Sequence, residues 1–335
     1  MEKGKLFKQC VGIDISKQSF TACVCKYYIS DLADYSSVEE FSNSKTGFNQ
    51  FVKWSRKFLC KEIAGIYLME ATGVYNEALA YHLHKLHLQV AVVLPNKARH
   101  HMLGEGVKTK TDKVDARNLS QMGAFKPIRL WTPPPLIYRQ LRSLTRFRIE
   151  LTKQQTVLKN HLEALENSQE SAPSVVKSYK KMLKDTGKAM ESNDREIQGL
   201  VKADKILYER ICKLETIKGL GFHTIVTILG ETQGFELITS RKQLASYAGL
   251  DVVHRESGSS VMGKTKISKK GNSHIRGVLY FPAMVAARYN KHLQQDYQRI
   301  AERNLKHKRI AIIAIERKLL LLIYTLWKSG EVFKE

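Results

Sequence analysis

The sequence predicts an α/β domain, then a long helical segment, then a mostly α-helical C-terminal part. Three observations lead to this fold class. Short apolar, β-branched segments alternate with helically spaced ones over residues 9–130, prolines interrupt the chain within 131–137, and leucines then recur every seven residues. Alternation of strands with helices is typical of layered α/β folds.

The N-terminal segments are justified one by one. Each predicted strand is short and apolar, as buried strands are, and Pro95 stops the last one. The first predicted helix has aromatic residues at helical spacing, from Phe48 to Phe58. We expect strands at 9–16, 20–29, 63–70 and 88–95, and helices at 46–59, 74–86 and from Thr111 or Asp112 onward.

The segment 131–137, which reads WTPPPLI, marks a boundary, because consecutive prolines continue neither a helix nor a central strand. The leucines at 144, 151, 158 and 165 then predict a helix over 138–168 with a seam for another helix, and a second helical segment to about 214. These two segments form either an intramolecular hairpin or a coiled-coil dimerisation arm. The predicted domains are 1–130, 131–212 and 213–335.

Composition limits the function. The 335 residues carry 55 Lys and Arg against 32 Asp and Glu, a formal charge of +23, and 43% are apolar. Such a chain builds cores, so a disordered polycation is excluded and a polyanion is the default partner, although a merely basic protein is the alternative. The longest strongly apolar uncharged run, 319–327, is shorter than the roughly 20 residues of a membrane span. The N-terminus does not resemble a signal peptide, and five cysteines without zinc-finger spacing suggest a reducing cytoplasm.

Four carboxylates stand out in this basic chain. Asp14 and Glu70 each end an apolar strand, while Asp112 and Asp115 share one face at the start of a helix. If these groups converge, they repel one another unless a divalent cation such as Mg²⁺ or Mn²⁺ neutralises them. Two such ions suit phosphodiester chemistry. Singly, each acid has a structural alternative, since Asp112 serves equally well as a helix cap and Asp115 as a partner for lysine.

Candidate nucleic-acid contacts lie mostly toward the C-terminus. Gly219 and Gly221 form a turn resembling a helix-hairpin-helix, which offers backbone N–H groups to a phosphate, although a plain glycine turn is the alternative. Residues 251–280 are rich in Gly, Ser and Lys and are predicted to form a phosphate-contacting loop, although a solvated basic face is the alternative. We interpret His100 and His101 as surface or nucleic-acid contacts. The full candidate set is Lys110, Arg117, Gly219, Gly221, Arg255, Lys264, Lys266, Lys269, Lys270 and Arg276.

The motifs resemble one family. In the N-terminal part they are GIDISK (12–17), MEATG (69–73) and KTDKVDAR (110–117). In the C-terminal part they are IKGLG (217–221), QLASYAGL (243–250), ESGSS (256–260) and ISKKGNSHIR (267–276). They resemble the DEDD-type insertion-sequence transposases, which include the pilin-gene DNA invertase and RNA-guided recombinases. The chain departs from the family at Asp251, after the AGL triplet, where a proline often follows.

This resemblance implies an RNase H-like domain, similar to that of RuvC-type Holliday-junction resolvases, in which Asp14, Glu70, Asp112 and Asp115 bind Mg²⁺. It implies that Ser257 attacks a DNA phosphodiester to give a covalent phosphoserine. It also implies a homodimer or homotetramer, donor and target DNA, and a structured non-coding guide RNA. From its surroundings alone, Ser257 is an ordinary loop serine among cations, and neither His254 nor His274 is an evident base for it.

We therefore expect an insertion-sequence transposase that cuts and rejoins DNA through Ser257, assisted by Mg²⁺. Two other functions stay open. A resolvase-like nuclease would use the four carboxylates and a metal-activated water without a serine intermediate. A non-catalytic basic protein would bind nucleic acid and keep the acids for structure alone.

Overall fold

The computed structural model describes residues 4–71, 73–107, 109, 111–236, 238–257 and 261–334, and the side chains of 254–265 lie outside this description. The chain divides into two compact units, Met1–Pro133 and Pro134–Glu335. Each unit has hydrophobic cores of its own. The predicted proline boundary coincides with this division, while the three-part division stays a prediction.

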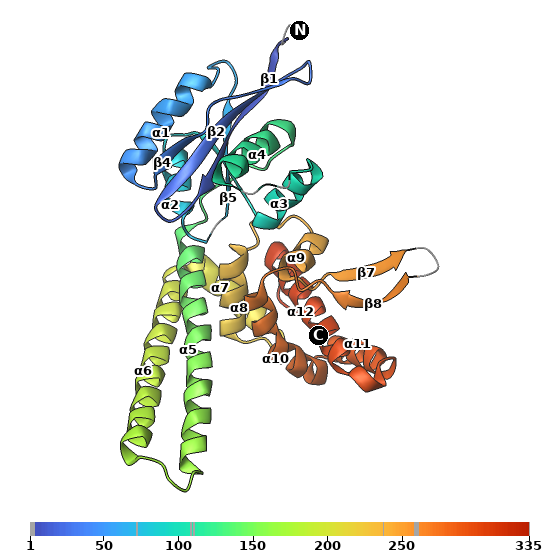
Figure 1. The fold of residues 1–335 in the computed structure, drawn as a ribbon. Helices are drawn as coiled ribbons and strands as arrows, with labels where there is room; N and C mark the ends of the chain where they lie inside the picture. Colours follow the sequence, from blue (N-terminus) through green and yellow to red (C-terminus); the bar gives the residue numbers. More distant parts are fainter. Residues whose placement is uncertain are drawn as a thin grey trace. The chain divides into compact units, whose positions relative to one another are not determined.

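A mixed β-sheet forms the centre of the first unit (Figure 1). Its order is β3-β2-β1-β5-β6, with β4 also paired to β2. The pair β1 and β2 is antiparallel, whereas β1 with β5 and β5 with β6 are parallel. The strands are β1 Leu6–Ile15, β2 Ser19–Tyr28, β3 Ala33–Tyr35, β4 Glu39–Ser42, β5 Gly65–Glu70 and β6 Gln89–Val93.

Helices cover both faces of this sheet. Phe51 of one helix and Leu79 of another pack on one face, while Leu119 and Met122 pack on the other. The helices are α1 Lys45–Phe58, α2 Glu77–Lys85, α3 Pro95–Gly104 and α4 Asp112–Phe125. This confirms the predicted α/β layering, with β3, β4 and α3 in addition. Sequence patterns miss α3 because only Ala98 and His101 on it are buried.

Close packing between β1 and α4 sets the position of the carboxylates. A Cβ atom on Gly12 would lie 2.0 Å from the amide nitrogen of Ser120 and 2.3 Å from the carbonyl oxygen of Ala116. A Cβ atom on Gly123 would lie 2.1 Å from Cys10 Sγ. The two glycines therefore let the helix backbone rest directly on the strand.

The second unit is mainly helical, as predicted, and α5 and α6 lie side by side as a helical hairpin (Figure 1). Its core includes Leu141, Ile197 and Ile211. Its elements are α5 Leu136–Glu166, α6 Pro173–Ala203, α7 Lys205–Glu215, α8 Phe222–Thr232, α9 Arg241–Ala248, β7 Val252–Ser257, β8 Val261–Ile267, α10 Ser273–Tyr289, α11 Lys291–Glu302, a 3₁₀ turn at Leu305–His307 and α12 Arg309–Ser329.

Three expectations for this unit need correction. The second helical segment does not run unbroken to 214, because Asp204 ends α6 and caps α7 by accepting a hydrogen bond from Leu207 N at 3.0 Å. Within residues 251–280, which are predicted to form a loop, strands β7 and β8 pair as an antiparallel hairpin. The C-terminal segment 276–330, whose apolar and basic faces predict two helices, contains three, because the chain turns at Asn290 and again at the 3₁₀ segment, while Pro282 lies inside α10.

The cysteines are all unpaired thiols. Cys10, Cys23 and Cys25 are buried in the first unit, whereas Cys60 and Cys212 are only half-buried. Burial raises the pKa of the Cys10 and Cys23 thiols, and it raises the pKa of Cys25 to about 12. Among the described helices, none has the length and apolar character needed to cross a membrane.

Candidate active site

Strand register brings the first two carboxylates together. In the parallel pair β1 and β5, Ile13 lies opposite Met69, and the next residues along these strands are Asp14 and Glu70. The predicted placement of both acids at strand ends is confirmed. Because the two strands run parallel, both carboxylates reach the same edge of the sheet.

Helix α4 contributes the other two carboxylates. Thr111 is its N-cap, and Thr111 Oγ1 accepts a hydrogen bond from Val114 N at 3.3 Å. Asp112 and Asp115 therefore lie in the first turn, where the helix N-terminus favours negative charge. The start of the helix is also fixed to the sheet, since Thr21 Oγ1 on β2 donates to the carbonyl oxygen of Asp112 at 3.0 Å.

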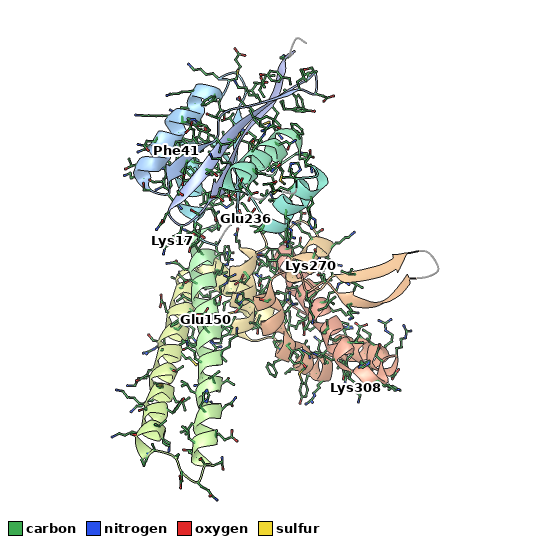
Figure 2. The ribbon with its side chains drawn as sticks, in the orientation of Figure 1. Lys17, Phe41, Glu150, Glu236, Lys270 and Lys308 are labelled. Carbon is green, nitrogen blue, oxygen red and sulfur yellow. The ribbon has the colours of Figure 1, made fainter. Side chains whose placement is uncertain are left out.

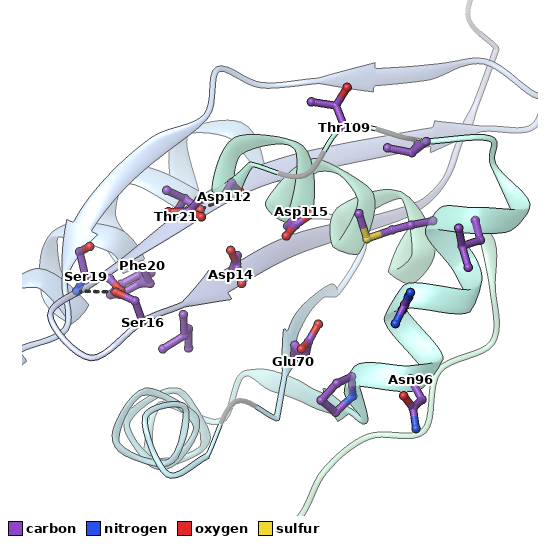
Figure 3. A pocket seen from close by; sticks show the side chains of 16 residues that line it. Asp14, Ser16, Ser19, Phe20, Thr21, Glu70, Asn96, Thr109, Asp112 and Asp115 are labelled. Atoms are coloured by element: carbon purple, nitrogen blue, oxygen red, sulfur yellow. Dashed lines mark hydrogen bonds between the residues drawn. The ribbon is translucent and has the colours of Figure 1, made fainter. Parts of the chain in front are cut away.

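All four carboxylates line one cavity of about 750 Å³. In Figure 3 the side chains of Asp14, Glu70 and Asp115 point into the same space, with Asp112 beside Thr21. The remaining wall comes mostly from the β1–β2 turn and from α3 and its C-terminal side. The cavity residues are Asp14, Ile15, Ser16, Ser19, Phe20, Thr21, Glu70, Pro95, Asn96, Arg99, Met102, Leu103, Val107, Thr109, Asp112 and Asp115.

The donor set of this cavity fits a hard divalent cation, because carboxylate oxygens are the ligands that Mg²⁺ and Mn²⁺ prefer. Three separate segments, β1, β5 and α4, supply these oxygens. Within the described residues, no three His, Cys, Asp or Glu side chains form a group that could hold an ion as they stand. The carboxylates thus line the cavity wall without closing a cage.

Sequence reasoning missed a residue beside the carboxylates. His101 is 4% exposed, contrary to the interpretation as a surface contact, and it lines a small second cavity with Glu70 and Asp115. Neither ring nitrogen has a hydrogen-bond partner among the described residues. Burial and nearby Lys126 hold the pKa of His101 below its usual value, against the opposing effect of Glu105, so the ring is neutral at pH 7. Its neighbour His100 is exposed, and the paired histidines gave no sign of this difference.

The candidate nucleic-acid contacts of the first unit are Lys110 and Arg117. Lys110 lies outside the described residues. Arg117 is exposed, and its guanidinium stacks over the ring of Tyr35 at 4.2 Å from the ring centroid. This contact leaves the side chain at the surface.

The glycine turn has an additional structural role. Gly219 has a φ of +93°, and a Cβ atom there would lie 2.8 Å from the amide nitrogen of Ala286 on α10. Gly221 is the N-cap of α8, with open space around its Cβ position. Gly219 is therefore needed for packing and backbone conformation, whereas Gly221 leaves room at the start of a helix.

The hairpin β7–β8 contains the predicted nucleophile. Ser257 is the last residue of β7, paired with Val261, so it does not lie in the predicted loop. The side chains of Ser257, Arg255 and Lys264 lie outside the described residues. The hairpin, whose first strand follows α9, projects from the helical body of this unit (Figure 1).

Beyond the hairpin, Lys266, Lys269 and Lys270 are exposed. Figure 2 labels Lys270 where the chain leaves the hairpin. Arg276 is half-buried, and its Nη1 donates to the carbonyl oxygen of Ala248 at 2.7 Å. This part of its guanidinium thus holds α9 to α10.

Comparisons with known proteins cover nearly the whole chain. Residues 11–167 match a DEDD-type IS110 transposase family, and residues 212–298 match the family described as transposase IS116/IS110/IS902. The chain is 30% identical over 330 residues to the pilin gene-inverting proteins of Moraxella lacunata and Moraxella bovis, covering 97% of this chain and 98% of each relative. The first match contains all four carboxylates, and the second contains Ser257 and the hairpin.

Proposed function

Because the chain belongs to the IS116/IS110/IS902 family of transposases and is therefore a DNA recombinase, we propose that it cuts and rejoins DNA through a covalent bond to Ser257. The observation that carries the metal-assisted part of this proposal is the convergence of Asp14, Glu70, Asp112 and Asp115 on one cavity, while the family match over residues 212–298, which contain Ser257, supports the serine part. A sheet with parallel strands and paired acids at its edge also supports an RNase H-like, RuvC-type fold for the first unit.

The cleavage step is a transesterification. The Oγ atom of Ser257 forms a bond to phosphorus while the bond from phosphorus to one deoxyribose oxygen breaks, and the serine proton leaves as the released deoxyribose oxygen gains one. The reverse attack by the hydroxyl of another strand end restores a phosphodiester and frees Ser257. One phosphoester bond forms for each that breaks, so the reaction needs no external energy source.

The carboxylates are the proposed holders of Mg²⁺ or Mn²⁺. When bound, such an ion supplies positive charge that stabilises a phosphate undergoing substitution. Asp14 and Glu70 stand on strands, and the N-cap of Thr111 fixes the helix of Asp112 and Asp115, so the protein contributes a rigid ligand frame.

The partners follow from charge and family. A net charge of +23 suits binding of donor and target DNA together with a structured guide RNA, whose backbone such surfaces contact. The α5–α6 hairpin is the proposed coiled-coil arm of a homodimer or homotetramer, and the Gly219–Gly221 turn is the proposed helix-hairpin-helix contact to phosphate. We place this activity in the bacterial cytoplasm.

A denaturing gel tests the proposal. The protein is incubated with Mg²⁺, labelled DNA spanning the end of its element and a target, and RNA transcribed from the flanking non-coding region. We expect a labelled DNA–protein adduct that is absent in Ser257→Ala and in EDTA. Ser259→Ala is the matched control, because it removes a hydroxyl from the same ESGSS segment and should keep the adduct.

The two alternative functions, a metal-dependent nuclease and a non-catalytic binding protein, predict different results on this gel. Cleavage without an adduct, unchanged in Ser257→Ala but lost in EDTA, would identify a metal-dependent nuclease. Binding without cleavage in any condition, unaffected by Asp14→Asn, would identify a nucleic-acid-binding protein. Either result would overturn the role of Ser257.

A further inference from the structure

A fully buried carboxylate lies at the centre of the second unit, far in sequence from the four acids. Glu231, the penultimate residue of α8, is 2% exposed. Arg146 of α5 binds it with two hydrogen bonds, Nε to Oε1 at 2.5 Å and Nη2 to Oε2 at 2.9 Å. Arg142 Nε lies 3.5 Å from Oε2, and Asn272 Nδ2 donates to Oε2 at 2.6 Å. Glu231 therefore joins α5, α8 and the start of α10.

These contacts keep Glu231 charged. Burial alone would raise the pKa of its carboxyl group, but hydrogen bonds from Arg146 and Asn272 and the charges of Arg146 and Arg142 outweigh burial and lower the pKa. A buried carboxylate of this kind stabilises the fold only while its partners are in place, because an unpaired buried charge is strongly destabilising. The ionic cluster thus favours one arrangement of its partners over neighbouring ones.

Asn272 connects this cluster to the base of the β7–β8 hairpin. Its side-chain Oδ1 caps α10 by accepting from His274 N and Ile275 N, while its Nδ2 binds Glu231. Its backbone N–H donates to the carbonyl oxygen of Tyr247 at 2.7 Å. Tyr247 in turn donates from its hydroxyl to the carbonyl oxygen of Glu231 at 2.7 Å. Both segments that enter and leave the hairpin are therefore fixed to one residue.

The same two segments are bound to each other directly. Ser268 N donates to the carbonyl oxygen of Asp251 at 2.9 Å, and Lys269 N donates to that of Gly249 at 3.1 Å. A Cβ atom on Gly271 would lie 2.4 Å from Gly249 N, so the two backbones are in close contact. The hairpin thus begins from a closed base, and Glu231 contacts both segments of that base through Asn272 and Tyr247.

We propose that Glu231 is a positioning residue that fixes the hairpin bearing Ser257 to the arm helix α5, through Asn272 on one side and Arg142 and Arg146 on the other. It acts through its partners and touches no DNA. The catalytic part of this inference rests on the proposed function, whereas the structural part does not. Both arginines lie on α5. A displacement of α5 would therefore change the contacts of the same carboxylate that positions the hairpin.

The experiment compares three variants of the full chain with the wild type. Glu231→Gln keeps the volume and removes the charge, and Glu231→Asp keeps the charge on a shorter side chain. Asn272→Asp still caps α10 but no longer donates to Glu231. Asp194→Asn is the matched control, since it removes the negative charge from another arginine pair of α5, Arg148 Nε with Asp194 Oδ1 at 2.7 Å, which does not involve the hairpin.

Two readouts are taken, amide hydrogen exchange of residues 266–272 and the single-turnover rate of adduct formation. In Glu231→Gln and Asn272→Asp we expect exchange at Ser268, Lys269 and Asn272 to accelerate roughly tenfold to a hundredfold, as loss of a charged hydrogen bond implies. Adduct formation should slow by a similar factor while affinity for DNA stays unchanged. Glu231→Asp should recover part of both, and Asp194→Asn should match the wild type.

Wild-type exchange and adduct rates in Asn272→Asp would overturn the inference, even if Glu231→Gln fails to fold. Equal acceleration of exchange over the whole second unit would also overturn it, because Glu231 would then be a general stabiliser. If the wild type forms no adduct but exchange accelerates only at the hairpin base, the positioning role stands and the proposed function fails.

Discussion

The hydroxyl of Thr21 on β2 donates a hydrogen bond to the main-chain carbonyl oxygen of Asp112 at 3.0 Å. Thr21 is also the β2 partner of Asp14 in the antiparallel ladder. One side chain therefore holds the first turn of α4 beside the strand that carries another of the four carboxylates.

Replacing Thr21 by valine removes this hydrogen bond and nearly preserves the side-chain volume. Because the Thr21 side chain, at 7% exposed, no longer makes this hydrogen bond, we expect a loss of about 1 kcal/mol in the free energy of unfolding. Urea unfolding measures the change. Thr21→Ser, which keeps the hydroxyl, should lose clearly less, and equal losses in both variants would assign the effect to packing.

A methyl group at Gly12 should separate α4 from β1. The added Cβ atom would meet backbone atoms at 2.0 and 2.3 Å, so the helix must move, and we expect Gly12→Ala to lose roughly 3 kcal/mol or more of unfolding free energy. Gly187→Ala on α6 is the opposite control. Apart from its chain neighbours and its own helix backbone, no heavy atom of the described residues lies within 4 Å of its Cβ position, so it should gain about 0.5 to 1 kcal/mol. A neutral Gly12→Ala would contradict the close packing.

Removing one carboxylate should weaken divalent cation binding. We expect Asp14→Asn to lower the affinity for Mn²⁺ at least about tenfold, since one charged oxygen ligand is replaced by a neutral one. Isothermal titration calorimetry measures this directly, without DNA. Asp31→Asn, in a turn of the same unit where asparagine tolerates the φ of +61°, should bind as the wild type does. Equal affinity in all three proteins would place the ion elsewhere.

Glu316 on α12 makes stability depend on pH. Burial raises the pKa of its carboxyl group to about 7, against the charges of Arg276 and Arg309, so the folded protein binds this proton more tightly than the unfolded chain does. Its ionisation therefore destabilises the fold as pH rises from about 4.5 through 7. Glu316→Gln should stabilise by about 3 kcal/mol at pH 8 and by less than about 1 at pH 5. A gain independent of pH would contradict this origin.

Complementation tests whether one active site draws on two protomers. If it does, mixing Asp14→Asn with Ser257→Ala should restore part of the adduct formation that each variant lacks alone. The adduct should then form on the Asp14→Asn chain, since only that chain retains the serine, and a size tag on one chain identifies it. A mixture as inactive as its components would argue for a site within one chain.

The sequence predicts much of the first unit because its signals are local. Asp14 and Glu70 end apolar runs, and Thr111 precedes a helical pattern, so strand ends and a cap follow from neighbouring residues. The cavity depends on a longer-range fact, the contact of Gly12 with α4, which no spacing reveals. The burial of His101 is equally hidden, because α3 carries too few buried side chains for a periodic pattern.

In the second unit the prediction fails where tertiary pairing decides the outcome. Residues 251–280 look like a loop because Gly, Ser and Lys are abundant, yet β7 and β8 within them pair as an antiparallel hairpin. In the sequence, Glu231 is only a polar residue at the end of an apolar helix. Its partners Asn272 and Arg146 lie 41 and 85 residues away, so no local pattern indicates them. A single acid after the run Ile225–Leu229 is a signal too weak to distinguish burial from exposure.

The contrast among the thiols offers a practical consequence. Cys10, Cys23 and Cys25 are enclosed, while Cys60 belongs to the first unit and Cys212 to the second, both only half-buried. Maleimide dyes should therefore attach to one position in each unit of the natural chain. Single-molecule energy transfer between them would then follow the distance between the units, in real time, while DNA is bound, cut and released.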